Sequence, residues 1–77
     1  MGTNLINFYT LIKIKTMYYR IYAKFAGQTK FQALDLSTGQ QVINLIYATL
    51  IPSENLGKVQ QIIEDNKEVK FEIRKAN

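Results

Sequence analysis

The sequence predicts a small α+β domain in which one helix packs on one face of a mainly antiparallel sheet of four to five strands, in the order β-β-β-β-α-β. Three patterns support this prediction: alternation of side chains over residues 18–25, an amphipathic helical pattern over 53–66, and a second alternating stretch at 69–74. The chain has 77 residues, of which 47% are apolar. A chain of this size buries only about 60% of the surface that it exposes when unfolded, so we expect a single domain over residues 1–77.

The first alternating stretch predicts a strand with one buried face and one solvated face. Tyr19, Ile21, Ala23 and Phe25 lie on one face, and Tyr18, Arg20, Tyr22 and Lys24 lie on the other. Turn-forming residues at 26–29 are followed by a second predicted strand at 30–36, which would return beside the first as a hairpin. A second turn is expected at residues 37–40.

Residues 42–51 are rich in apolar side chains, and periodicity does not separate a buried helix from a buried strand in a run of this length. Their β-branched and aromatic content favours a central strand. A helical turn over residues 40–44 is the alternative.

The helix is predicted from its boundaries as well as from its periodicity. Pro52 ends the preceding strand, Ser53 is placed to cap the helix, and Glu54 suits its first turn. Asn66 is the expected end. The apolar stripe comprises Leu56, Val59, Ile62 and Ile63.

The N-terminal part has two interpretations. Residues 8–15 alternate between apolar and polar side chains, which predicts a further strand. Alternatively, residues 1–16 are an appendage, because Met17 could serve as an internal start.

The composition argues against catalysis. The chain has no cysteine and no histidine, so it lacks a disulfide, a thiolate metal ligand and the usual general base. Its six acids are scattered, and the glycine-containing segments 27–30 and 37–39 lack the spacing of a phosphate-binding loop. We therefore expect no enzyme activity, no cofactor and no metal.

No apolar stretch approaches the ~20 residues that cross a bilayer, and no signal-peptide pattern is present. We expect a cytoplasmic protein without a membrane partner.

Charge is unevenly distributed along the chain. Residues 1–34 contain five cations and no acid, and the rest contains five cations and six acids, which gives +5 followed by −1 and a net charge of +4. The cations of the first part are Lys13, Lys15, Arg20, Lys24 and Lys30.

Rings and cations alternate along the solvated face formed by Tyr18, Arg20, Tyr22 and Lys24, with each ring about 6.8 Å from the next cation. Such a face suits single-stranded nucleic acid, because bases stack on rings while cations neutralise phosphates. Ordinary cross-strand contacts between rings and cations explain the same residues without a ligand. A docking patch for protein is the third interpretation, since Tyr and Arg are enriched at interfaces.

Two segments, Leu45-Ile46-Tyr47-Ala48-Thr49-Leu50-Ile51-Pro52-Ser53-Glu54 and Phe71-Glu72-Ile73-Arg74, resemble small uncharacterised proteins of bacteria and their phages. The resemblance implies a phage or mobile-element setting and carries no functional motif.

Three function hypotheses follow. The leading one is a non-catalytic interaction protein, an inhibitor or accessory factor that acts through its sheet surface as a homodimer. The second is a nucleic-acid-binding module that uses the ring-and-cation face, with Lys13, Lys15 and Lys30 as electrostatic support. The third is sequestration of a small anionic ligand such as a nucleotide.

Overall fold

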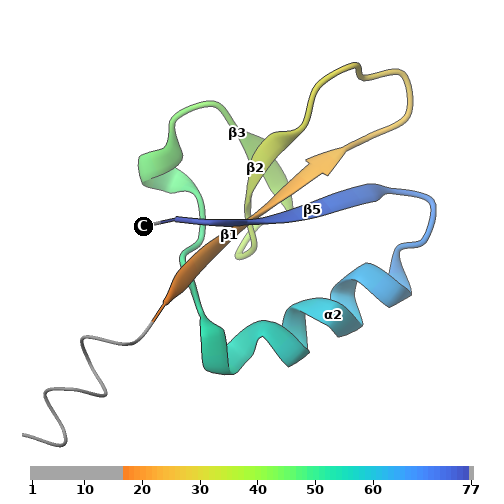
Figure 1. Ribbon diagram of the computed structural model, residues 1–77. Helices are drawn as coiled ribbons and strands as arrows, with labels where there is room; N and C mark the ends of the chain where they lie inside the picture. The colour runs from red at the N-terminus through yellow and green to blue at the C-terminus, as the bar shows by residue number, and fades with distance from the viewer. Residues whose placement is uncertain (1–16, 77) are drawn as a thin grey trace, which may run out of the picture.

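Strand β1 (Tyr18–Lys24) is the centre of the sheet in the computed structural model, which describes residues 17–76 (Figure 1). Along one edge it pairs antiparallel with β5 (Lys70–Lys75) over residues 19–24. The other strands are β2 (Gln32–Asp35), β3 (Gln40–Val42) and β4 (Ile51–Pro52). The described residues thus form a five-stranded, mostly antiparallel sheet with one α-helix, and the predicted α+β class and element order are confirmed.

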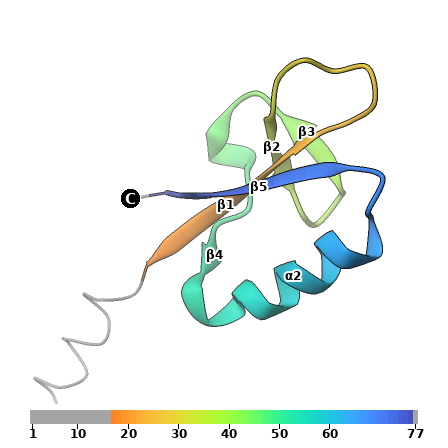
Figure 2. The same ribbon diagram turned by 45° about the vertical axis from the view of Figure 1, so that its right-hand side comes forward.

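The second edge of β1 is shared by two strands, β2 and β4. β2 pairs with β1 near its C-terminal end, and β4 pairs with it near its N-terminal end. β1 and β2 are paired only near the C-terminal end of β1 and separate toward its N-terminal end. Residues 49–52 lie in the fork between these two strands (Figure 2). Thr49 fastens this segment to β2, because its N–H donates to the carbonyl of Leu34 at 3.1 Å and its Oγ1 accepts from the N–H of Leu36 at 2.8 Å.

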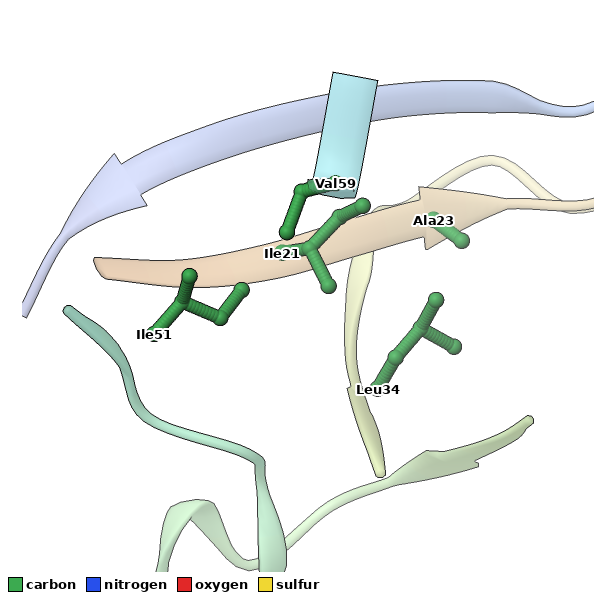
Figure 3. Close-up of a cluster of buried hydrophobic side chains, with 5 residues drawn as sticks. All are labelled: Ile21, Ala23, Leu34, Ile51 and Val59. Atoms are coloured by element: carbon green, nitrogen blue, oxygen red, sulfur yellow. The ribbon is translucent and has the colours of Figure 1, made fainter. Parts of the chain in front are cut away.

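The core lies between the sheet and the helix α2 (Leu56–Asp65). Five buried side chains from four elements point toward one another in Figure 3: Ile21, Ala23, Leu34, Ile51 and Val59. The buried set on β1 is the one that alternation predicted. Its other set therefore lies on the face of the sheet opposite α2, which we call the outer face.

Helix α2 begins later than predicted. The 3₁₀ turn η2 (Ser53–Asn55) precedes it, and the N–H of Leu56 donates to the carbonyl of Ser53. Ser53 therefore lies inside the first turn rather than before it, and the prediction that its side chain caps the helix is wrong. Asn66 ends the helix as expected, with its Nδ2 donating to the carbonyl of Ile62 at 2.8 Å.

The predicted long strand at 42–51 is wrong, since only its two end residues belong to strands. Residues Leu45–Tyr47 form a 3₁₀ turn, η1, whose first free amide, the N–H of Ile46, donates to Oδ1 of Asn44 at 3.1 Å. The alternative of a helical turn over 40–44 is also wrong, because β3 occupies most of that range.

Glycines with positive φ make both hairpin turns. Gly27, at φ 84°, lies in a turn closed by a 3.0 Å hydrogen bond from the N–H of Gln28 to the carbonyl of Phe25. Gly39, at φ 76°, donates to the carbonyl of Asp35 at 2.7 Å. Non-glycine residues adopt such φ values only with strain, which accounts for both glycines.

The predicted strand at 8–15, together with Lys13 and Lys15, lies outside the described residues. In the part of the chain that is described, no helix has the length and apolar content needed to cross a bilayer.

Candidate interaction surfaces

The outer face brings together the strand residues that the sequence singled out. Tyr18, Arg20, Tyr22 and Lys24 pair in register with Pro52, Arg74, Glu72 and Lys70, which therefore share that face. Four cations of this face come from two adjacent strands: Arg20, Lys24, Lys70 and Arg74. Lys30 lies apart from them, exposed in the loop between β1 and β2.

Two rings, those of Tyr22 and Phe31, already have cations against them. The guanidinium carbon of Arg74 lies 4.2 Å from the centre of the Tyr22 ring and 6.0 Å from that of Phe31. Lys24 Nζ lies 5.2 Å from the centre of the Phe31 ring. These are the cross-strand contacts that explain the alternation without a ligand.

Glu72 holds Arg74 in this position, with Arg74 Nε 3.2 Å from the carboxylate Oε1. The hydrogen bond to Glu72 raises the pKa of the guanidinium above its ordinary value, while desolvation acts in the opposite direction. Arg74 is therefore charged at every pH at which the protein is handled.

Arg20 is a partly buried cation of the outer face. It pairs directly with Arg74, a like charge. Within the described residues its Nε is buried and has no hydrogen-bond partner.

A second surface has a different character. Residues 43–50, which we call the apolar ridge, expose large side chains to solvent: Ile43, Leu45, Ile46, Tyr47 and Leu50. Ile43 is 92% exposed, Ile46 77% and Tyr47 67%. No side chain from residue 36 to residue 53 carries a charge. Large apolar side chains that are this exposed and this close together are typical of an interaction site.

Hydrogen bonds fix the backbone conformation of the ridge. Asn44 caps η1, and the N–H of Ala48 donates to the carbonyl of Leu45 at 3.1 Å. Ala48 is itself buried, and Thr49 follows it into the fork between β1 and β2. The exposed side chains are therefore presented by an ordered backbone.

Apolar surface continues from the ridge toward α2. Leu50 lines a shallow groove of about 190 Å³ together with Leu36 and Ile62. A second groove of about 190 Å³ is also lined by Leu36 and Ile62 and extends to Phe71. The first groove joins the ridge to helix α2, because Leu50 and Ile62 both line it.

The acids of the described residues form no cluster that suits a metal ion. Within residues 17–76, no three His, Cys, Asp or Glu residues lie close enough together to hold a metal ion. The carboxylate of Asp35 accepts from the N–H and the hydroxyl of Ser37 at 2.9 and 2.6 Å. Both hydrogen bonds lower the pKa of Asp35, the one from the hydroxyl more strongly. This carboxylate stabilises the turn between β2 and β3.

The sequence reasoning missed the apolar ridge because it assigned those residues to the interior. Two signals were available in the printed sequence. Asn44 interrupts the apolar run at a position suited to capping a turn. The run also lacks the strict alternation seen at residues 18–25.

Comparisons of the chain with protein-family models, with curated proteins and with solved structures found no match.

Proposed function

We propose that the protein is a non-catalytic interaction module that binds a partner protein through the apolar ridge. The observation that carries this proposal is the exposure of Ile43, Ile46 and Tyr47 on an ordered, charge-free segment.

The energetics favour burial of these side chains. Covering one exposed Ile or Leu contributes roughly 1.5–3 kcal/mol. Tyr47 adds an aromatic anchor of the kind that contributes most at interfaces. Because the backbone of η1 is hydrogen-bonded before binding, little ordering entropy opposes association. A partner with an apolar pocket and a polar rim fits this surface.

The biological setting belongs to the same proposal. The resemblance of residues 45–54 and 71–74 to small bacterial and phage proteins supports an inhibitor or accessory factor of a phage or mobile element, acting in the cytoplasm. The ridge falls largely within the first of these segments.

Binding of single-stranded nucleic acid on the outer face is the second candidate. Its support is the cluster of four cations on two adjacent strands. The contact of Arg74 with Tyr22 opposes it, because a base would have to displace the guanidinium or use the other side of the ring. A labelled oligonucleotide titrated at two salt concentrations tests this candidate. Affinity that falls steeply with salt and is lost in Tyr22→Ala would support it, and no binding at low salt would remove it.

A matched pair of variants tests the main proposal. Ile46→Asp adds a charge on the ridge, and Gln60→Asp adds the same charge at an exposed position of α2. Tagged wild-type protein and both variants are used to capture proteins from a lysate of the host cell. We expect at least one protein to be retained by the wild type and by Gln60→Asp but not by Ile46→Asp.

The purified candidate is then titrated with each variant. We expect Ile46→Asp to raise the dissociation constant at least about tenfold, since it removes a contact and buries a charge. Equal affinity for the two variants, or no protein that distinguishes them, would contradict binding through the ridge.

A further inference from the structure

The outer edge of β5 has no pairing strand among the described residues. The N–H of Ala76 donates to the carbonyl of Tyr18 at 2.8 Å, so these two residues form a hydrogen-bonded pair. Such pairs alternate along an antiparallel ladder. The N–H and C=O groups of Phe71, Ile73 and Lys75 therefore point away from β1, toward the open edge.

We propose that this edge pairs antiparallel with the β5 strand of a second copy, with Ile73 opposite Ile73 of that copy. The register uses the whole strand. It places the outward backbone groups of Phe71 opposite those of Lys75 and the two Ile73 residues opposite each other, so every outward group finds a partner. The inference does not depend on what the apolar ridge binds.

Charge complementarity selects this register. It places Glu72 opposite Arg74 of the second copy, and Arg74 opposite Glu72, on the outer face of the joined sheet. Opposite charges in directly facing positions stabilise a sheet, and like charges destabilise it. Each Arg74 would then lie between two carboxylates, one from its own strand and one from the second copy.

The neighbouring registers are less favourable. Sliding one strand by two residues places Glu72 opposite Glu72 and Lys70 opposite Arg74. Sliding it the other way places Arg74 opposite Arg74. A slide of four residues leaves only residues 70–72 paired within the strands, because residues 66–69 form a turn and a bend.

The rest of the strand is compatible with this symmetric contact. Lys70 faces the uncharged Ala76 of the second copy. Lys75 faces Phe71, along whose ring its aliphatic stem can lie. A two-fold axis through the Ile73 pair leaves both α2 helices on one face and joins the two outer faces into one surface. A domain of this size also has a small core, which dimerisation would extend.

Charge reversal provides a specific test by sedimentation velocity over a range of concentrations. We expect the wild type to dimerise, and Glu72→Arg and Arg74→Glu each to raise the dimer dissociation constant at least about tenfold, because each places like charges opposite each other twice. Mixing the two variants in equal amounts should restore dimers as heterodimers. In such a heterodimer, position 72 of each chain faces an opposite charge at position 74 of the other chain.

Glu54→Arg and Lys58→Glu are the matched controls, because they make the same charge changes on η2 and α2. They should dimerise as the wild type does. Circular dichroism of each variant checks that it is folded, and the mixing experiment excludes misfolding as the cause of a lost dimer.

A wild type that is monomeric at all concentrations would overturn the proposal, and so would a mixture of the two variants that stays monomeric. Dimers that persist in both single variants but disappear in Ile46→Asp would place self-association on the apolar ridge instead. Loss of partner binding in Ile46→Asp with the dimer intact would support both surfaces independently.

Discussion

The guanidinium of Arg74 lies over the ring of Tyr22 although the two residues are not directly opposite each other in the sheet. Tyr22 pairs with Glu72, and Arg74 reaches the ring diagonally across the two strands. The contact joins the central strand to the edge strand on the outer face. The contact also covers one side of the Tyr22 ring, on which a base would have to stack if this face bound nucleic acid.

We expect Arg74→Met to lower the melting temperature by a few degrees, because it removes the positive charge above the Tyr22 ring. Methionine keeps much of the aliphatic stem, so the change reports mainly on the charge. In a Tyr22→Leu background the same substitution should have a smaller effect. Thermal unfolding of the four proteins in this cycle measures the coupling, and Glu72→Gln controls for the loss of the ion pair. Equal effects in the two backgrounds would mean that the ring contributes nothing.

Thr49 fastens the ridge segment to β2 through its hydroxyl. We expect Thr49→Val to lower the free energy of unfolding by about 1–2 kcal/mol, because the partly buried N–H of Leu36 would lose its acceptor. Thr49→Ser keeps the acceptor and should cost less than half as much. Urea denaturation of both variants distinguishes the hydrogen bond from side-chain volume. Equal losses would argue against the hydrogen bond.

Substitutions on the ridge should separate binding from stability. We expect Ile43→Ser to change the free energy of unfolding by no more than about 0.5 kcal/mol, because the side chain is almost fully exposed. Ile51→Ala, eight residues further on, should cost about 2–4 kcal/mol because Ile51 belongs to the buried cluster. Denaturant titration of the two variants checks both values. A large loss in Ile43→Ser would mean that the ridge packs against the protein itself.

Asp35 predicts a dependence of stability on acid pH. Its pKa is lowered below the ordinary value of 3.8 in the folded protein, chiefly by the hydrogen bond from the Ser37 hydroxyl. A folded-state pKa below the unfolded value means that this stabilisation is fully present above the unfolded pKa. It is lost as the pH falls through the folded pKa.

We expect Asp35→Asn to flatten the decline of the melting temperature below pH 4, relative to the wild type. Thermal unfolding from pH 2 to pH 6 is the measurement. Parallel curves for the two proteins would show that other carboxylates account for the decline.

The parts of the fold with strict periodicity could be predicted from the sequence. Alternation identified the buried face of β1, because Ile21 and Ala23 must face the core when Arg20 and Lys24 face water. The helix could be placed by the spacing of Leu56, Val59 and Ile63, all of which pack against or within the core.

The apolar ridge could not be predicted in the same way. An apolar side chain is not always buried in the monomer, so apolar character alone does not locate it. Ile43, Ile46 and Tyr47 are apolar but lie outside the core. The divergence of β1 and β2 creates the fork that residues 49–52 fill, and this divergence depends on pairings between distant segments. The functional proposals that depend on Lys13 and Lys15 remain predictions from the sequence alone.

The way in which Thr49 and Ala48 secure the segment has an evolutionary consequence. The atoms that fix the backbone there are not the atoms that face solvent at positions 43, 46 and 47. A lineage of such chains could replace those three side chains, and so acquire a new target, without first evolving compensating changes in the scaffold. Related proteins would then share the Asn44 and Thr49 positions and diverge most where they meet their targets.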